Sequence, residues 1–190
     1  TEHMPQALLS REDLLDRLLG VFRDRGFDGA TIAEIARATG LGKASLYHHF
    51  PGGKVEMAET LVREVCAHLD REVFAVLKGK GSPSRRVQRM VKGLDQYLDG
   101  GHSNCLIGIF SLGTTRNRFG EAMSSEVRGW IDQIADVLME AGLSRKRARR
   151  RARDFLIRIQ GAIVISRALG TVKPYRQTIK HASKALLADA

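Results

Sequence analysis

Cysteine is scarce in this sequence of 190 residues. Cys66 and Cys105 are too few for a disulfide framework, so both thiols are expected to be reduced. No apolar run approaches the roughly 20 residues that are needed to cross a bilayer, and no basic and then apolar segment marks a signal peptide. We therefore expect a cytosolic chain with no membrane partner. Residues 1–4 have the character of an expression scar, which excludes them from the fold.

Known catalytic and metal-binding patterns are also missing. The sequence has no Ser-His-Asp, phosphate-loop or metal-ligand constellation, which argues against an enzyme. His48 and His49 are adjacent, and adjacent helical residues point about 100° apart, so they cannot easily share a metal ion. His102 and Cys105 are three residues apart with no second pair beside them. We expect no catalytic site, no metal site and no cofactor.

No alternating strand pattern, internal repeat or low-complexity linker is present, whereas apolar residues recur at helical spacing. Ser10 is placed to cap a first helix that Gly26 ends. Thr31 and Glu34 form a capping-box pattern that begins a second helix, which Gly40 ends. The chain is predicted to be all-α, with helices at about 11–25, 32–39, 43–49, 54–78, 85–99, 119–141, 145–169 and 174–187, and a short irregular or helical segment at 102–118.

Basic residues outnumber acidic ones, and the formal net charge of +10 is typical of proteins that bind nucleic acid. The charge is unevenly distributed. Residues 1–60 hold seven Lys and Arg against nine Asp and Glu, a net of −2, and residues 61–190 carry a net of +12. Net charge alone would place a nucleic-acid site in the C-terminal part, but the motif at residues 31–50 places it in the N-terminal part.

This motif is a capped helix, a Gly40-Leu41-Gly42 turn and a short helix with the sequence KASLYHHF, which together predict a helix-turn-helix. Leu46 is expected to face inward, with Phe50 at the far end of the helix. The outward side chains suit a DNA duplex. Lysine can pair with phosphate or guanine, serine with base or backbone, and tyrosine with phosphate, whereas alanine permits close approach to base edges. The expected outward residues are Lys43, Ala44, Ser45, Tyr47 and His48.

Residues 30–54, ATIAEIARATGLGKASLYHHFPGGK, resemble the N-terminal signature of the tetracycline-repressor (TetR/AcrR) family of transcriptional regulators. The layout is similar too: a three-helix head, expected at 8–53, is joined by a long helix to a larger helical body at 54–190. Gly42 departs from the pattern, because the family usually has serine there. The Gly52-Gly53 pair and the stretch CLIGIFSLG at 105–113 are similar to the LmrA/YxaF subgroup.

The resemblance implies a repressor that binds a palindromic operator as a homodimer and is released by a small lipophilic or aromatic effector in the body. Such a regulator would be cytoplasmic and nucleoid-associated. Thr31 and Lys54 would contact phosphates from helix N-termini, where free N–H groups favour anions. The alternative is a DNA-binding structural or occlusion protein with the same head and no effector. The expected DNA-binding residues are Thr31, Gly42, Lys43, Ala44, Ser45, Tyr47, His48 and Lys54.

Aromatic and apolar side chains on several helices of the body either fill its core or line an effector pocket, and the sequence leaves both possibilities open. A polar group to orient the effector is Gln160, which lies among isoleucines. Cys105 has the character of a small buried apolar residue. The candidate pocket residues are Tyr97, Cys105, Phe110, Met123, Trp130, Phe155, Ile159 and Gln160.

The stretch 155–169 is apolar nearly all round, which indicates burial on two sides. One side would pack on the body and the other on a second subunit, with the last helix completing a two-fold four-helix interface. The expected interface residues are Gly161, Ile165, Ala168, Leu169, Ile179, Ala182 and Leu186. The basic tract SRKRARRRAR at 144–153 is expected to be a solvated surface away from the DNA-binding head.

Overall fold

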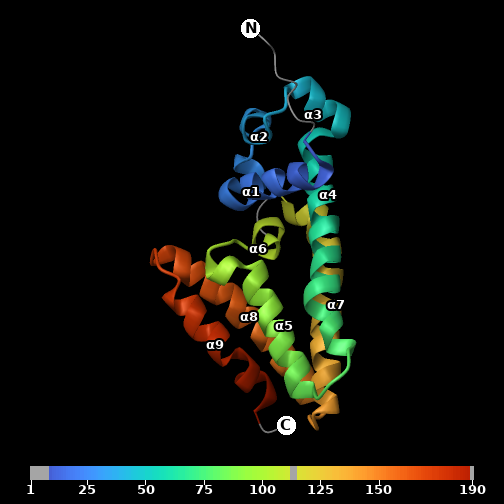
Figure 1. The fold of residues 1–190 in the computed structure, drawn as a ribbon, viewed down its shortest axis with the longest axis vertical. Helices are drawn as coiled ribbons and strands as arrows, with labels where there is room; N and C mark the ends of the chain where they lie inside the picture. Colours follow the sequence, from blue (N-terminus) through green and yellow to red (C-terminus); the bar gives the residue numbers. More distant parts are fainter. Residues whose placement is uncertain (1–8, 112–114, 189–190) are drawn as a thin grey trace. The chain divides into compact units, whose positions relative to one another are not determined.

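The computed structural model describes residues 9–111 and 115–188, apart from the side chain of Arg116 (Figure 1). Within these ranges the chain consists of helices joined by turns, with no strand, so the predicted all-α class is confirmed. Backbone contacts divide the chain into two compact units, residues 1–63 and residues 64–190. The division falls inside α4 (Gly53–His68). The domain limits expected at 53 and 54 stay a prediction.

The first unit contains α1 (Arg11–Gly29), α2 (Ile32–Thr39) and α3 (Lys43–His49), and α4 begins in it. The sequence signals at the helix starts are confirmed. The Ser10 hydroxyl accepts a hydrogen bond from the Asp13 N–H at 3.0 Å. The side chains of Thr31 and Glu34 bond each other's backbone N–H groups, as a capping box requires. Apolar side chains from the first three helices form the core, including Leu18, Phe22, Ile35 and Leu46, which are fully buried.

Two glycines shape this unit. Gly26, expected to end the first helix, has φ +68° and ψ 179°, a conformation that side-chain-bearing residues avoid, and one further turn follows it to Gly29. Gly40 ends α2 in the left-handed conformation with φ +73°. Arg17 of α1 donates to the Thr39 carbonyl at 3.1 Å. The turn between α2 and α3 is thus tied to α1.

The second unit begins within α4, which the sequence predicted to be one helix to about residue 78. The helical course continues, but not as an α-helix throughout. After His68 it widens into a π-helical segment, η1 (Leu69–Phe74), and then tightens into a 3-10 turn, η2 (Ala75–Lys78). The remaining elements are α5 (Pro83–Tyr97), η3 (Asp99–Gly101), α6 (Leu106–Phe110), α7 (Arg116–Glu140), α8 (Arg145–Ala168) and α9 (Lys173–Leu187).

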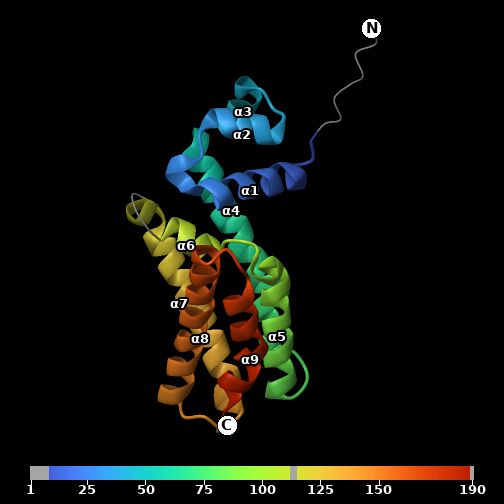
Figure 2. The same ribbon diagram turned by 90° about the vertical axis from the view of Figure 1, so that its left-hand side faces the viewer.

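In this unit α8 packs against both α7 and α9, and α5 contacts α7 and α9 (Figures 1 and 2). The core between these helices is aliphatic and aromatic, with Met90, Leu98, Phe110 and Ile134 fully buried. Pro174 lies in the first turn of α9, as expected for a proline at a helix start. The buried Tyr175 follows it and anchors α9 to the rest of the unit.

A buried arginine joins three elements of the second unit. Arg86 of α5 has a side chain that is 7% exposed, and it donates to the Leu77 carbonyl of η2 at 2.7 Å. It also forms an ion pair with Glu140 at the end of α7. The hydrogen bond from Arg86 holds the pKa of Glu140 below its usual range. The hairpin between η2 and α5 is therefore tied to α7 through one guanidinium group.

Replacing Arg86 by Met is expected to lower the free energy of unfolding by about 1.5–3 kcal/mol, because the buried Leu77 carbonyl loses a charged donor. The neighbouring Arg85 is exposed, so Arg85→Met is the matched control and should change stability by less than about 0.5 kcal/mol. Urea unfolding of both variants measures the difference. Equal losses in the two variants would contradict the role assigned to Arg86.

Candidate nucleic-acid interface

The short helix α3 has one inward side chain and a row of outward ones. Leu46 is fully buried and Phe50, directly after the helix, is 3% exposed. The side chains of Lys43, Ala44, Ser45, Tyr47 and His48 are all exposed, and we call this set the outer face of α3. It is the arrangement that the sequence predicted, and it leaves two hydroxyl groups, a lysine and a histidine free to meet a ligand.

Tyr47 rests on Gly53, which the sequence analysis named only as part of the Gly52-Gly53 pair. A β-carbon placed on Gly53 would lie 3.3 Å from Cε1 of Tyr47, and Gly53 has φ +64°, which favours glycine. The absent side chain lets the phenol ring pack over the backbone at the start of α4 while the residue remains 48% exposed. Gly53 is therefore a supporting residue of the outer face.

The helix N-termini near this face differ in how their N–H groups are satisfied. Gly42, the N-cap of α3, offers no side-chain cap, and the first turn of α3 contains no acidic residue. In contrast, the Thr31 hydroxyl at the start of α2 is engaged with Glu34, and the backbone N–H of Thr31 lowers the pKa of that carboxyl group. Glu34 also pairs with Arg25 at 3.5 Å. An anion is thus better accommodated at the start of α3 than at Thr31.

Lys54 and Glu56 in the first turn of α4 make internal contacts that the sequence did not indicate. The Lys54 ammonium group donates to the Phe27 carbonyl at 2.8 Å and lies 4.5 Å from the centroid of the Phe27 ring. The Glu56 carboxylate accepts the Gly52 N–H at 2.7 Å. A phosphate contact by Lys54, which the family resemblance implies, stays a prediction.

The aromatic candidates of the body lie in its interior. Trp130 is 3% exposed and stacks on Phe74 of η1 with the ring centroids 5.1 Å apart. Phe110 and Phe119 form an edge-to-face pair at 5.0 Å. Met123, Phe155, Ile159 and Cys105 are buried, and Tyr97 and Gln160 are half-buried. A β-carbon on Gly108 of α6 would lie 3.8 Å from the Gln160 amide oxygen, so these two candidate positions are neighbours.

The sequence analysis missed two carboxylates of the body, Asp70 and Glu126, which lie close enough to Cys66 to act on its thiol. Asp70 accepts a hydrogen bond from the Trp130 indole N–H at 3.0 Å. Burial and the charge of Asp70 raise the pKa of Glu126. Burial, together with these two carboxylates and Cys105, raises the pKa of the Cys66 thiol to about 12. The spacing of four residues in the pairs Cys66/Asp70 and Glu126/Trp130 was the available signal, since it places each acid on an inward helix face.

A second exposed feature is an apolar surface on α8. Among the large hydrophobic residues in the described part of the chain, the exposed ones are Tyr47, three on α8 (Ile157, Val164 and Ile165) and Leu169, which directly follows α8. Gly161 and Ala168 on the same helix are also exposed. The sequence analysis named Ile165 and Leu169 but missed Ile157 and Val164. Ile179 of α9 is half-buried, and Ala182 and Leu186 are buried within the chain itself.

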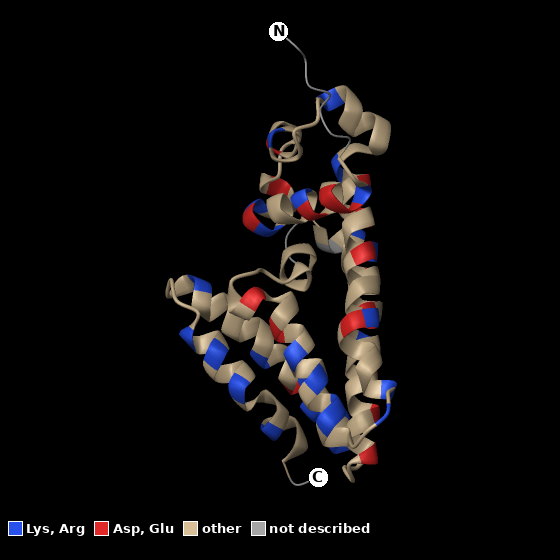
Figure 3. Ribbon diagram, in the orientation of Figure 1, with Lys and Arg blue, Asp and Glu red and all other residues tan. Residues whose placement is uncertain are grey.

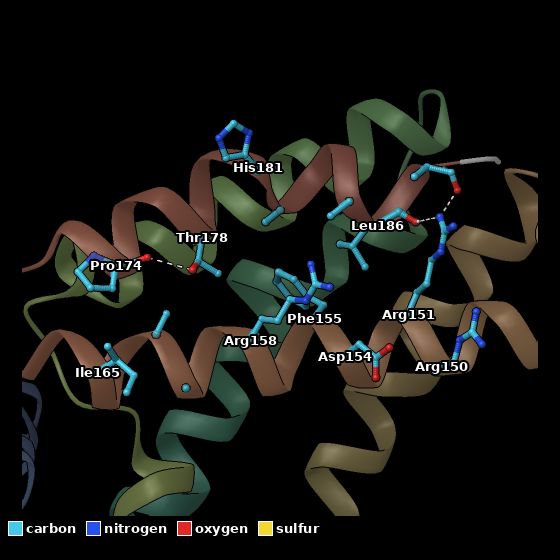
Figure 4. Close-up of a pocket in the computed structure, with 15 residues that line it drawn as sticks. Arg150, Arg151, Asp154, Phe155, Arg158, Ile165, Pro174, Thr178, His181 and Leu186 are labelled. Carbon is cyan, nitrogen blue, oxygen red and sulfur yellow. Dashed lines mark hydrogen bonds between the residues drawn. The ribbon is translucent and has the colours of Figure 1, made fainter. Parts of the chain in front are cut away.

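A groove of about 750 Å³ lies between α8 and α9, and Figure 4 shows the residues that line it. Phe155 and Arg158 lie between the two helices, and Ala182 and Leu186 line the groove from α9. Arg151 reaches across to the C-terminal end of α9 and donates to the Leu186 and Ala188 carbonyls. Apolar side chains thus line much of the groove, Arg158 projects between the helices, and Arg150 and Arg151 lie toward the C-terminal end of α9.

The basic tract of α8 forms an exposed surface, as expected. Ala148 and Ala152 face inward, whereas Arg145, Lys146, Arg149 and Arg150 are exposed. Lysine and arginine recur along the helices of the second unit (Figure 3). Arg149 pairs with Asp132 of α7, and Arg153 lies 3.8 Å from Asp154. No group of three or more histidine, cysteine or acidic side chains within the described ranges could hold a metal ion. None of the helices there is long and apolar enough to span a membrane.

Comparison with known proteins agrees with this organisation. Residues 14–61 match the family described as bacterial regulatory proteins of the tetR family. Residues 83–181 match the C-terminal domain of LmrA/YxaF-like transcriptional regulators. Among curated proteins, the transcriptional regulator LmrA of Bacillus subtilis is 26% identical over 83% of this chain and 86% of its own length. The uncharacterized regulator YxaF of the same organism is 24% identical over 83% of this chain and 84% of its own length.

Solved structures show the same fold. A TetR regulator from Legionella pneumophila superposes with a TM-score of 0.78 at 15% identity, covering 94% of this chain and 98% of its own. The regulator CifR, solved with a 26bp double-strand operator DNA, gives 0.72 at 20% identity over 96% and 99%. FadR of Bacillus subtilis in complex with stearoyl-CoA gives 0.73 at 13% identity over 95% and 100%. The chain belongs to the TetR family of bacterial transcriptional regulators, with a DNA-binding helix-turn-helix head and an LmrA/YxaF-like body.

Proposed function

We propose that this regulator is a repressor that binds a palindromic operator as a homodimer and leaves it when a small lipophilic effector enters the body. The observation that supports DNA contact most directly is the outer face of α3. Its polar side chains are all exposed, while Leu46 alone is buried. The relative CifR was solved with operator DNA, which supports the same use of the head in this chain.

On the outer face each residue type has a role in the proposal. Lys43 neutralises a phosphate or pairs with guanine, and Ser45 bonds a base edge or the backbone. Tyr47 donates a hydrogen bond from its hydroxyl group to a phosphate. The small side chain of Ala44 allows the helix to approach the base edges in the DNA groove. His48 and the uncapped N–H groups that follow Gly42 add further donors. Thr31 lies at the edge of this surface, where the capping box limits its availability.

Dimerisation is supported by the apolar surface of α8. Soluble monomers rarely leave a contiguous row of large apolar residues in water. Ile157, Val164 and Ile165 are 60%, 64% and 50% exposed, and Gly161 between them permits close helix approach. In a two-fold interface both subunits contribute the same surface, so the apolar patch of one subunit is covered by the identical patch of the other. Two α3 helices related by this axis would occupy two equivalent half-sites, which accounts for a palindromic operator.

The effector is expected to enter the body, where the buried Trp130 and Phe110 and the half-buried Gln160 lie on three different helices. The relative FadR was solved with stearoyl-CoA, which supports a lipophilic ligand here. The alternative is a DNA-binding structural or occlusion protein with the same head and no effector. A thermal-shift screen of lipophilic aromatic compounds separates the two, because a ligand that binds the native state stabilises it in a concentration-dependent way.

Selection of bound DNA from a random pool tests the proposed function. We expect an enriched sequence with two inverted half-sites whose centres are separated by about one helical turn or a multiple of it. Enrichment of a single, non-symmetric site would contradict the proposal that the protein binds as a dimer. Recovery of no preferred sequence would contradict the proposal that it is a repressor of a specific operator.

Lys43→Gln should flatten the salt dependence of operator binding. If Lys43 neutralises one phosphate, the slope of log K against log[salt] falls by about 0.9. The control is the double variant Arg145→Gln, Lys146→Gln in α8, which removes more charge from exposed positions of the body and should leave the slope nearly unchanged. Operator titration at several salt concentrations measures both. A slope that falls only in the control would place the DNA site on the body.

Ile165→Glu should convert the dimer to a monomer, because the interface would have to bury a carboxylate without a partner. Sedimentation equilibrium measures the change in mass. Arg145→Glu, an exposed change at the N-terminal end of the same helix, should remain dimeric. An Ile165→Glu protein that stays dimeric and folded would rule out this surface as the interface.

Enlarging the side chain at position 108 should alter the response to effector more than the affinity for DNA in its absence. Gly108→Leu adds volume beside Gln160 but changes nothing in the head. An effector releases DNA only through its different affinities for two conformations, so a change in the pocket acts on release. Operator binding with and without a screened ligand measures both quantities. If the effector still releases a folded Gly108→Leu protein from the operator as it does the parent protein, the region around position 108 does not line the effector pocket.

A further inference from the structure

We propose that the exposed side of α5 and the loop before it form a binding site for a small soluble ligand with two linked phosphate groups. The site is a depression of about 470 Å³ in the surface of the second unit. It lies in the body, and neither the head nor the proposed contact with DNA takes part in it. The depression, which we call the α5 basic depression, is lined by Lys80, Gly81, Arg85, Gln88, Arg89 and Lys92.

Four cations meet in this depression. Arg85, Arg89 and Lys92 follow one another at intervals of four and three residues, which places them on one face of the helix. All three are exposed, as is Lys80 on the loop. Figure 3 shows lysine and arginine along α5 and on the loop that leads into it. Like charges at this spacing repel one another, so the face is destabilising unless an anion binds there.

Carboxylates in the described part of the chain do not neutralise these cations. Within residues 9–111 and 115–188, no acidic side chain forms an ion pair with any of the four. Asp95, the one acidic residue of α5, is half-buried and lies beside Tyr175 of α9. Burial and then the charge of Asp95 raise the pKa of that tyrosine. The positive charges of the depression are therefore free to meet a ligand.

The loop that forms one wall of the depression is fixed in place before any ligand binds. The Arg89 guanidinium group donates to the Lys80 carbonyl at 2.6 Å. Gly81 has φ +110°, which favours glycine, and a β-carbon there would lie 3.6 Å from the same guanidinium group. Just before the loop, the Leu77 carbonyl accepts from the buried Arg86. A ligand thus finds a formed site, which lowers the cost of ordering it.

The chemistry of the lining indicates phosphate. Guanidinium groups match phosphate oxygens in a bidentate way, and lysine adds a compact charge. A phosphate ester carries about 1.5–2 negative charges at neutral pH, so four cations are matched by two linked phosphates. The volume of about 470 Å³ falls in the range of about 300–1,000 Å³ that is usual for small-molecule sites.

A soluble ligand is favoured over a lipid headgroup. Proteins that bind a membrane surface commonly add apolar side chains that enter the lipid. In the described ranges, the exposed large hydrophobic residues are Tyr47 and four at or after position 157, so none lies on α5 or on its loop. The depression offers charge without an apolar anchor.

Calorimetric titration of the whole chain with inorganic pyrophosphate, at constant ionic strength, tests the site. The parent protein should bind pyrophosphate, and it should bind inorganic phosphate at least about tenfold more weakly, because a single phosphate makes fewer charged hydrogen bonds. Arg85→Gln and Lys92→Gln should each weaken pyrophosphate binding by about tenfold or more. Both residues are exposed, so the folded state should be retained.

The matched control is Arg145→Gln, Lys146→Gln, which removes two exposed cations from α8. That helix is separated from α5 by α7 and α9 (Figure 2), so the control should bind pyrophosphate as the parent does. Gln88→Glu is a second variant of the site. It places a carboxylate among the four cations and should abolish binding.

Two further probes distinguish the source of the phosphate. ADP should bind and compete with pyrophosphate, whereas vesicles of phosphatidylglycerol should not retain the protein. Retention on vesicles that is lost in Arg85→Gln, together with no binding of ADP, would overturn the assignment to a soluble ligand.

The proposal is also open to contradiction from the titrations themselves. A folded parent protein that does not bind pyrophosphate would overturn it. Equal losses in the control and in the two site variants would show attraction to the overall charge of the body and no site on α5. Equal affinities for phosphate and pyrophosphate would contradict two linked phosphates. None of these measurements uses DNA, so the proposed function is judged separately.

Discussion

Burial of the Leu46 side chain is the contact on which the DNA-binding head depends. Isolated helices shorter than about 12–15 residues are marginal in water, and α3 has 7 residues. Its place is therefore set by its surroundings: Leu46 is fully buried, and Phe50 closes the far end. Full burial of a leucine contributes about 1.5–3 kcal/mol, a large share of what so short a helix can gain. Once Leu46 points inward, the neighbouring polar residues must point outward.

The head also explains how a unit with a slight excess of acidic residues can bind DNA. What matters is where the acids lie. Glu34 caps α2 and pairs with Arg25, and Glu56 accepts the Gly52 N–H, so both carboxylates are committed to local contacts. The first turn of α3 contains no acid at all. In the body, the basic tract of α8 is partly neutralised by Asp132 and Asp154 and partly caps α9.

Local signals in the sequence predicted much of this fold. The Ser10 cap, the Thr31/Glu34 capping box and the Gly40 turn depend on residues only a few positions apart, and the structure confirms all of them. The burial of Leu46 and the exposure of the residues on either side of it follow from helical periodicity. The α8 surface was predicted in part, because a helix that is apolar all round shows that two faces are covered but not which residue lies on which face.

Contacts between distant residues could not be predicted from the same signals. Lys54 meets Phe27, and Trp130 meets Asp70 across 60 positions, and no periodic pattern encodes either pairing. The π-helical segment Leu69–Phe74 keeps the apolar spacing of an ordinary helix, so periodicity did not reveal it. Gly53 was named only as part of the Gly52-Gly53 pair, and its contact with the Tyr47 ring could be seen only once the position of the ring was known.

The central proposal is that the outer face of α3 contacts operator DNA, once in each half of a homodimer. It is tested most directly by attaching a DNA-cleaving iron chelate to a cysteine at position 45. Cys66 and Cys105 are both buried, so Ser45→Cys provides the accessible thiol in the folded protein. We expect cleavage at two sites related by the two-fold axis of the operator, about one helical turn or a multiple of it apart. Cleavage from a chelate at Arg147→Cys in the body, with none from position 45, would contradict it.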